Sequence, residues 1–493
     1  MTRANEKGIA VILALFMVLV VSTLTTSLMF VSQTETWSSQ NYKMMSQARY
    51  AAESGVHAAA NHLMFAYVPP GTVGDPLAAY NMTITPVTSG GNTVVLSSDA
   101  GTAADYPVAA VRDAFLAASQ GTLTTDNGTA GYTAVARMTS MQQIISAYTA
   151  TPVTLVTWEI TGVGRINGAR SAETEVTTVL ERTKLPAYSY AAFATYNGCA
   201  ALSFAGGATT DSYNSASALV GGSPGLIAGG GNVGTNGNLT EVGNPTVING
   251  SVSTPRSGVG ACTANNVTAE SITNATVTQG LTQLAQPLSF PTPDPPNPLP
   301  PTTNIGFTQN GGCPAGAVAP WCVASANGAT LDPALTATPG TMVLGNITTN
   351  GNSVVHLKAG TYIVNSLMEN GNSKLVVDSG PVIFKIAGVD QATPLSLTGQ
   401  GVSNTTYNPQ NLQFVYDGTG NIQLAGGAET SALLYAPNAS GGFAGGFDWY
   451  GAVIMKKVTA TGGASIHYDI QLQNNAFVAG NQVMSAFSWK KYS

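Results

Sequence analysis

The segment GIAVILALFMVLVVSTLTTSLMFV, residues 8–31, decides how the rest of the chain is arranged. Apolar residues run without interruption from Ile9 to Val21, and no ionisable side chain occurs between Lys7 and Glu35. At a rise of about 1.5 Å per residue, residues 9–31 form a helix that covers a hydrocarbon core of about 30 Å. The segment therefore predicts a membrane-spanning helix.

The residues before this helix predict its orientation. Arg3 and Lys7 outweigh Glu6, and a net positive leader places the N-terminus in the cytoplasm and the remaining chain outside. The apolar block continues directly into helix-compatible sequence, without the small-residue cleavage site of a secretory signal. We therefore expect the helix to be retained.

Lys7-Gly8 followed by the apolar run 9–15 resembles the leader and helix start of type IV pilin-like proteins. In that family a prepilin peptidase cuts after the glycine and methylates the new amino terminus, which implies a cut between Gly8 and Ile9. Major pilins carry a glutamate at the fifth mature position, where this chain has Leu13. PilX-type minor pilins and the large tip pseudopilin of type II secretion also lack this acid and are associated with the filament tip. An uncleaved signal anchor is the alternative.

The resemblance implies that the apolar helix carries filament assembly, through side chains such as Leu13, Phe16 and Val20. It also implies the partners: the inner membrane, the prepilin peptidase and other pilins or minor pilins. The protein is then expected in the bacterial inner membrane before assembly, and on an extracellular filament or the cell surface afterwards.

The helix is expected to continue to residue 66, because Pro69-Pro70 ends the helical pattern. The stretch QARYAAESG, residues 47–55, is similar to the signature that follows the membrane segment in PilX-like proteins. Its small residues recur at spacings of three or four, which makes one flat face that another element can approach closely. This face consists of Ala48, Ala52, Gly55 and Ala59. We expect it to meet the protein's own sheet.

Residues 67–186 are predicted to form a small pilin-like α/β domain. Residues 154–161 and 172–181 alternate apolar and polar side chains, which is typical of half-buried strands, and Asn167-Gly168 suits the hairpin turn between them. The stretch 69–145 shows weak periodicity, and it is interpreted as loops with a short helix near residues 106–119.

Regular spacing appears after Pro186. The sequence Asn350-Gly351-Asn352-Ser353 returns 20 residues later as Asn370-Gly371-Asn372-Ser373, and each copy precedes a short β-branched strand. A period near 20 with Gly/Asn turns predicts a right-handed parallel β-helix, in which each rung buries its apolar residues on the next. The region also resembles the β-helical part behind PilX-like N-termini. The predicted parts are residues 187–286, a loop at 287–340 that contains two cysteines and, within residues 287–301, eight prolines, and residues 341–485.

Composition excludes several classes of protein. Charged residues make up 9% of the 493 residues and the net charge is −6, without clustered Lys and Arg, which argues against a nucleic-acid partner. The four histidines are not grouped with the cysteines, so we predict no zinc site and no cofactor.

The cysteines follow the membrane segment and are expected in an oxidising compartment, where disulfides are the default. They are Cys199, Cys262, Cys313 and Cys322. Spacing favours Cys313 with Cys322, across a loop containing Pro314, and leaves Cys199 with Cys262. Four cysteines allow three connectivities, and the sequence alone does not choose among them.

A β-helical polysaccharide lyase has to be weighed, because such enzymes share this scaffold. Lyase chemistry needs calcium-binding carboxylates and a strong base or cation facing one groove. After Arg182 the only arginine is Arg256, and Lys456 and Lys457 are adjacent, so on a strand they would point to opposite faces. His467, with Asp469 and Asp448, is interpreted as a packing residue. We therefore predict that the chain is not an enzyme.

An aromatic cluster in the last third of the chain is the remaining recognition candidate. It consists of Phe443, Phe447, Trp449 and Tyr450. Such side chains are suited to stack on a sugar or to bind a partner, but an internal stack of the β-helix explains them equally, and we favour the internal stack. Together the patterns predict a minor pilin-like protein whose β-helical body serves assembly or adhesion. The rival is an anchored adhesin or carbohydrate-binding protein.

Overall fold

The computed structural model describes residues 6–125, 128–149, 151–167, 171–309, 312–313, 320–325, 327–426 and 429–492. The chain divides into two compact units. The pilin-like unit comprises residues 1–144, 153–183 and 479–493, and the solenoid unit comprises residues 145–152 and 184–478. The chain thus leaves the pilin-like unit twice, briefly at residues 145–152 and then for the main insertion at residues 184–478, and returns to it each time.

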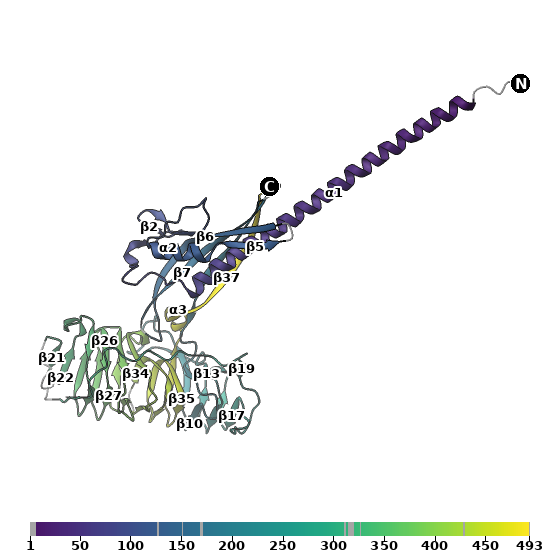
Figure 1. Cartoon of the computed structure of the whole chain (residues 1–493). Coiled ribbons are helices and arrows are strands. Elements are labelled where there is room, and N and C mark those ends of the chain that lie inside the picture. Colours follow the sequence, from purple (N-terminus) through teal and green to yellow (C-terminus); the bar gives the residue numbers. More distant parts are fainter. Residues whose placement is uncertain are drawn as a thin grey trace. The chain divides into compact units, whose positions relative to one another are not determined.

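The pilin-like unit is built on α1 (Glu6–Phe65). Of the helices in the described residues, α1 has the length and composition to cross a membrane. Its first half projects from the sheet of this unit (Figure 1), and its second half packs on that sheet. The predicted small-residue face is confirmed, because Ala48, Ala52 and Ala59 are completely buried.

One sheet of the pilin-like unit has the strand order β37-β8-β7-β6-β4, with β5 paired to β6. Neighbours β7 and β8, β4 and β6, and β5 and β6 are antiparallel. The strands are β4 (Val95–Ser97), β5 (Gly121–Thr125), β6 (Gly128–Ile145), β7 (Pro152–Ile166), β8 (Ala172–Pro186) and β37 (Phe477–Tyr492). A long helix with an antiparallel sheet packed on it is the predicted pilin-like arrangement.

Smaller elements complete this unit. They are η1 (Leu77–Ala79), α2 (Ala109–Ala118) and a three-stranded sheet of β1 (Tyr80–Asn81), β2 (Thr88–Ser89) and β3 (Asn92–Thr93). The short helix expected near residues 106–119 is confirmed by α2, whereas the interpretation of the rest of residues 69–145 as loops is wrong, since β6 alone runs for 18 residues. Its buried positions are alanines and methionines, such as Ala134, Ala136 and Met138, which carry little strand signal. Gly168, expected in the turn after β7, lies outside the described residues.

The solenoid unit is a three-sided stack of short parallel strands. Side 1 contains β23 (Thr341–Val343), β26 (Gly360–Val364), β29 (Val382–Ile386), β32 (Leu412–Tyr416), parts of β34 (Glu429–Ala444) and β35 (Asp448–Ala460), then β9 (Ala192–Ala194), β13 (Val233–Thr235), β16 (Val252–Thr254) and β19 (Leu281–Gln283). Side 2 contains β20 (Asn304–Phe307), β24 (Asn346–Thr349), β27 (Ser366–Glu369), β30 (Leu395–Leu397), β33 (Ile422–Ala425), the ends of β34 and β35, then β10 (Leu202–Ala205), β14 (Leu239–Val242) and β17 (Glu270–Thr273).

Side 3 contains β21 (Cys322–Ser325), β22 (Gly328–Leu331), β25 (Val354–Leu357), β28 (Lys374–Val377), β31 (Val402–Ser403), the starts of β34 and β35, then β36 (Ser465–Asp469), β11 (Thr209–Tyr213), β15 (Val247–Ile248) and β18 (Thr276–Val277). The turns hold η2 (Pro333–Leu335), η3 (Pro409–Asn411), α3 (Leu472–Asn475) and β12 (Leu226–Ile227). Among the described strands of this unit, two pairs are antiparallel, β12 with β11 and β21 with β22. The predicted large parallel region is confirmed, whereas its right-handed sense remains a prediction.

The rungs do not follow the order of the chain. The stack runs from residues 304–331 through to 465–469 and continues with residues 192–213, 233–254 and 270–283, so that β22, β26, β34, β35, β13 and β19 succeed one another in Figure 1. We call the junction of β35 with β9 and β10, and of β36 with β11, the seam. The solenoid therefore has the rung order of a circular permutation.

The interior of the solenoid is continuous across the seam. On side 1, paired inward residues follow one another from rung to rung, and this column includes Tyr362, Phe384, Phe414, Leu434, Val453, Ala192, Val233 and Val252, all buried. The rings of Phe384 and Phe414 are stacked, with centroids 5.5 Å apart. One core thus stabilises both parts of the chain.

A proline-rich strap, residues 287–301, connects the last rung of the first part, which ends with β19, to β20 at the opposite end of the stack. It is fixed on the way by Asn236, whose side chain exchanges two hydrogen bonds of 2.8 Å with the backbone of Leu288, and by the Tyr435 hydroxyl, which donates to the Pro291 carbonyl at 2.5 Å. We expected the loop to extend to residue 340, but β20, β21 and β22 already form rungs, because the proline run stops at Pro301. The expected end of the solenoid at residue 485 also differs, since β37 returns to the pilin-like sheet.

Candidate functional site

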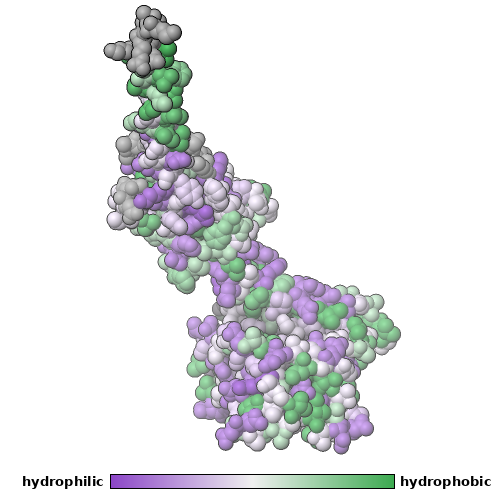
Figure 2. Space-filling view, turned by 90° about the vertical axis from the view of Figure 1, so that its right-hand side faces the viewer, coloured by the Kyte–Doolittle hydropathy of each residue, from purple (hydrophilic) through white to green (hydrophobic). Residues whose placement is uncertain are grey.

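The first half of α1 presents exposed apolar side chains. Ile9, Leu13 and Phe16 are 65%, 61% and 68% exposed, and Val20 is 38% exposed. Figure 2 shows the projecting end of the helix covered with hydrophobic residues. Such a surface needs a cover, which a membrane or neighbouring apolar helices supply. The backbone of Gly8 lies in the first turns of the same helix.

Gly162 and Gly164 of β7 let α1 lie directly on the sheet. A Cβ atom at Gly164 would overlap the carbonyl oxygen of Ala48, and one at Gly162 would overlap that of Ala52. The close approach fixes the helix to the sheet in one position. Sequence analysis did not single out these glycines, because a glycine within a strand does not identify its partner.

The aromatic recognition candidate is an internal stack. Phe443, Phe447 and Trp449 are completely buried and Tyr450 is 6% exposed. Phe443 and Trp449 pack edge to face with centroids 5.7 Å apart. Phe443, Phe447 and Trp449 belong to the core of the solenoid, and Tyr450 packs with Tyr213 and Tyr407 in a separate buried cluster, so none of the four offers a face to a sugar.

His467 joins the two parts of the solenoid across the seam. Its Nδ1 lies 2.5 Å from Asp211 Oδ1 on β11, and its Nε2 lies 3.6 Å from Asp448 Oδ1 on β35. Burial lowers the pKa of His467, but the hydrogen bonds and charges of Asp211 and Asp448 outweigh burial and raise that pKa to about 9. Asp469, the expected partner, instead accepts hydrogen bonds from the backbone of Ser215 and Gln471. The arrangement is a buried ion pair in a packed junction.

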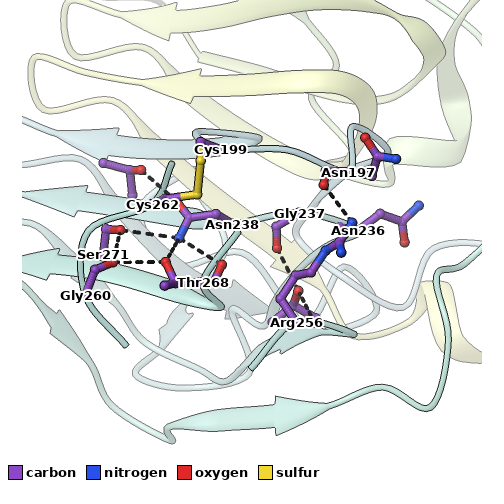
Figure 3. The surroundings of a disulfide bond; sticks show 12 residues. Asn197, Cys199, Asn236, Gly237, Asn238, Arg256, Gly260, Cys262, Thr268 and Ser271 are labelled. Atoms are coloured by element: carbon purple, nitrogen blue, oxygen red, sulfur yellow. Dashed lines mark hydrogen bonds between the residues drawn. A yellow bond between two sulfur atoms is a disulfide. The ribbon is translucent and has the colours of Figure 1, made fainter. Parts of the chain in front are cut away.

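Two disulfides brace the solenoid. Cys199 is bonded to Cys262, and Cys313 is bonded to Cys322, which are the two pairs that spacing favoured. The first holds the turn before β10 to the loop after β16 (Figure 3). Pro314, expected in the loop of the second, lies outside the described residues.

Two buried carboxyl groups were not identified from the sequence. Burial raises the pKa of Glu241 to about 7, with a further contribution from Glu270, and burial raises the pKa of Glu369 to about 8. No group of three or more potential ligands occurs among the described residues in a geometry suited to a metal ion. Glu241 lies in β14 and Glu369 in β27, and both side chains are buried. These strands have only four residues each, which is too few for alternation to predict burial.

A groove lies at the corner between sides 1 and 2, next to the seam. It encloses about 440 Å³. Its lining residues are Thr195, Tyr196, Asn197, Asn236, Pro287, Thr419, Pro437, Asn438 and Lys456. Amide, hydroxyl and ammonium groups predominate, and none of these residues is acidic. A second cavity of about 280 Å³ lies between the strap and side 1, and its lining includes Asp294, Lys385 and Asp417.

The prediction that Lys456 and Lys457 point to opposite faces of a strand is wrong. Met455 and Val458 on either side of them are completely buried, whereas Lys456 is exposed and Lys457 is partly exposed. Both lysines therefore point outward, because β35 bends from side 1 to side 2 at this place and the alternation of a straight strand is broken. The paired strand β34 shows the same irregularity between Ala436 and Ser440.

The N-terminal segment matches a known protein family. The family described as PilX N-terminal matches residues 7–57. The chain carries a PilX-type pilin region. This region comprises the exposed apolar half of α1 and the part of the helix that packs on the sheet. A second family, a domain of unknown function called DUF7305, matches residues 345–475, which end next to the seam.

Comparison with solved structures adds one pilin. The competence-associated pilin ComZ from Thermus thermophilus is similar at 14% identity, over 91% of this chain and 98% of that chain, with a TM-score of 0.27. No curated protein matches the chain. The PilX-type region is thus the part of the chain with a family assignment that bears on function.

Proposed function

We propose that the protein is a minor pilin-like subunit of a type IV pilus or a related filament. Assembly runs through the PilX-type region, and the solenoid unit is the part displayed outside. The exposed apolar half of α1 carries the proposal, because its side chains have no partner within the described residues of this chain and the segment matches the PilX N-terminal family. Proteins with this region are typically structural and not enzymes.

The same proposal includes cleavage of the leader and a position at or near the filament tip. A peptidase cut between Gly8 and Ile9 would remove the charged leader and leave Ile9 as a methylated terminus. Leu13 supports a place at or near the tip, because an apolar side chain cannot pair with the amino terminus of a preceding subunit as a glutamate does.

A cleavage-blocked variant, Gly8→Val, tests the proposal. We expect the variant protein to stay in the membrane fraction and to be lost from the fraction that shearing releases from cells, because an unprocessed subunit does not enter a filament. The control is Gly74→Ala, since nothing lies within 4 Å of a Cβ atom at Gly74 and its backbone needs no glycine. If the wild type is confined to the membrane fraction as well, so that Gly8→Val changes nothing, the helix is a plain anchor and the protein is an anchored adhesin.

A further inference from the structure

The groove at the corner between sides 1 and 2 is built from one turn of each successive rung. Rungs on both sides of the seam contribute lining residues: Asn438 follows side 1 of β34, Lys456 lies in β35, Tyr196 and Asn197 follow β9, and Asn236 follows β13. Lys457 of β35 and Arg256, which follows β16, border the groove through contacts to its lining residues. Neighbouring strands are about 4.8 Å apart, so these side chains form a column with one step per rung. A column of this kind suits a ligand that repeats at a similar interval.

Of the three cations at this column, two are held by contacts to groove residues. The Lys457 ammonium lies 4.3 Å from the centroid of the Tyr196 ring. Arg256 donates from Nε to the Asn236 carbonyl at 3.1 Å and from Nη2 to the Asn197 carbonyl at 2.7 Å (Figure 3). Lys456 lines the groove itself. The guanidinium and one ammonium are thus oriented before any ligand arrives.

The charge of the groove is opposite to that of the whole chain. The chain has a net charge of −6 with 18 lysines and arginines, and three of them meet here beside a lining without acids. The acid of the neighbouring turn, Asp417, lines the other cavity. A carboxylate-bearing ligand is therefore favoured over a cationic one.

The remaining lining is suited to hydroxyl groups. Asn197 and Thr419 are exposed, and Figure 3 shows the Asn197 side chain directed away from Arg256. Asn236 and Asn438 are held by hydrogen bonds to the backbone of Leu288 and Asp417, which gives the groove fixed walls together with Pro287 and Pro437. A pre-formed site with amide and hydroxyl groups recognises ligands through several directed hydrogen bonds.

We propose that this groove binds an extended acidic polysaccharide, with its carboxylates at Lys456, Lys457 and Arg256 and its hydroxyl groups at the asparagines. The proposal rests on the display of the solenoid proposed above and names the ligand class of the displayed body. A nucleic acid is disfavoured, because DNA binding requires many phosphate contacts and here three cations stand in an acidic chain.

The test measures binding by the full chain in detergent with isothermal titration calorimetry. The probes are hexamers of galacturonate and of hyaluronan, with maltohexaose as a neutral chain of equal length. We expect at least one acidic hexamer to bind, and the double variant Lys456→Gln/Lys457→Gln to lower its affinity at least tenfold. The control Lys374→Gln removes a lysine on side 3 and is expected to leave affinity unchanged.

Several results would overturn the inference: no binding of either acidic hexamer, equal affinity for maltohexaose, an undiminished affinity of the double variant, or tighter binding of a double-stranded DNA fragment. The double variant is also assayed in the sheared filament fraction, where it is expected at the wild-type level. Loss of binding with normal display supports the groove. Normal display without any binding removes the groove proposal and leaves the pilin proposal in place.

Discussion

At the scale of single residues, His467 connects chain segments that are 256 residues apart in the sequence. Its side chain is 6% exposed and lies between Asp211 and Asp448, with the Tyr450 ring at 4.5 Å between centroids. A protonated imidazole in this place forms one close charged hydrogen bond across the seam and has a second carboxylate nearby. Stability of the solenoid should therefore depend on its proton.

The pH dependence follows from the raised pKa. Because the folded-state pKa is about 9 and the ordinary value is 6.5, the contribution of His467 is complete below pH 6.5 and is lost as pH rises through 9. One pKa unit corresponds to about 1.4 kcal/mol, so the contribution is on the order of 3 kcal/mol. Urea unfolding of the wild type is expected to show this loss between pH 6.5 and 9.5, and His467→Gln to be weaker at pH 6 and flatter over the range. Equal pH profiles of the two proteins would contradict the assignment.

Sequence reasoning reached part of this site. It predicted packing and not catalysis for His467, and it named Asp448, which lies near the ring. It did not find Asp211, because β11 belongs to another part of the chain and only the rung order brings the two together. For the same reason Arg256 and Lys456 were considered separately, although both border one groove.

At the scale of elements, the contact of α1 with β7 is made by backbone against backbone. The helix turns at Ala48 and Ala52 lie on Gly164 and Gly162, where no side chain fits between them. The small face of the helix was predictable from its spacing. The glycines that contact this face were not predictable, because alternation along a strand indicates which residues are buried but not which element they pack against.

Gly164→Val is expected to move α1 away from the sheet. Overpacking of a core costs about 1–3 kcal/mol, and the upper end applies here because the overlap is with helix backbone and not with a flexible side chain. Thermal unfolding of the full chain in detergent should show a lower transition for the pilin-like unit. Gly74→Ala serves as the control with unchanged stability. A variant that unfolds like the wild type would mean that the helix is not seated on Gly164.

In the solenoid, the periodicity of the sequence predicts the rungs. Gly351 and Gly371 both have positive φ, 66° and 69°, so the repeated Asn-Gly turn marks equivalent corners of neighbouring rungs. The 20-residue interval therefore predicted parallel rungs correctly. It could not predict β6, whose alanines, threonines and glycines carry neither strong alternation nor bulky side chains.

At the scale of the whole molecule, the solenoid is one core made from two parts in reversed order. This arrangement brings the two ends of the segment between β8 and β37 close together at the seam. There the Ala187 amide donates a hydrogen bond to the Ala476 carbonyl at 2.9 Å. A period in the sequence reveals rungs but not their succession, because every rung presents similar strands to its neighbours. The permuted order therefore required the structure.

Cleavage of the strap tests the permuted order. A protease site inserted at Leu299, whose side chain is 64% exposed, allows the chain to be cut between β19 and β20. We expect the two fragments to elute together in size-exclusion chromatography and to unfold near the temperature of the uncut protein, because the pairing at the seam and the pairing of β37 with β8 hold them. Separation of the fragments without denaturant would show that the strap, and not the seam, keeps the solenoid together.

The central claim is that the PilX-type region enters a filament after processing. The most direct measurement is the intact mass and N-terminal sequence of the membrane-extracted protein, from cells with and without their prepilin peptidase. The account predicts a chain that begins at methylated Ile9 only when the peptidase is present. A chain that keeps the residues before Ile9 in both strains would contradict it and leave a solenoid carried by a plain membrane anchor.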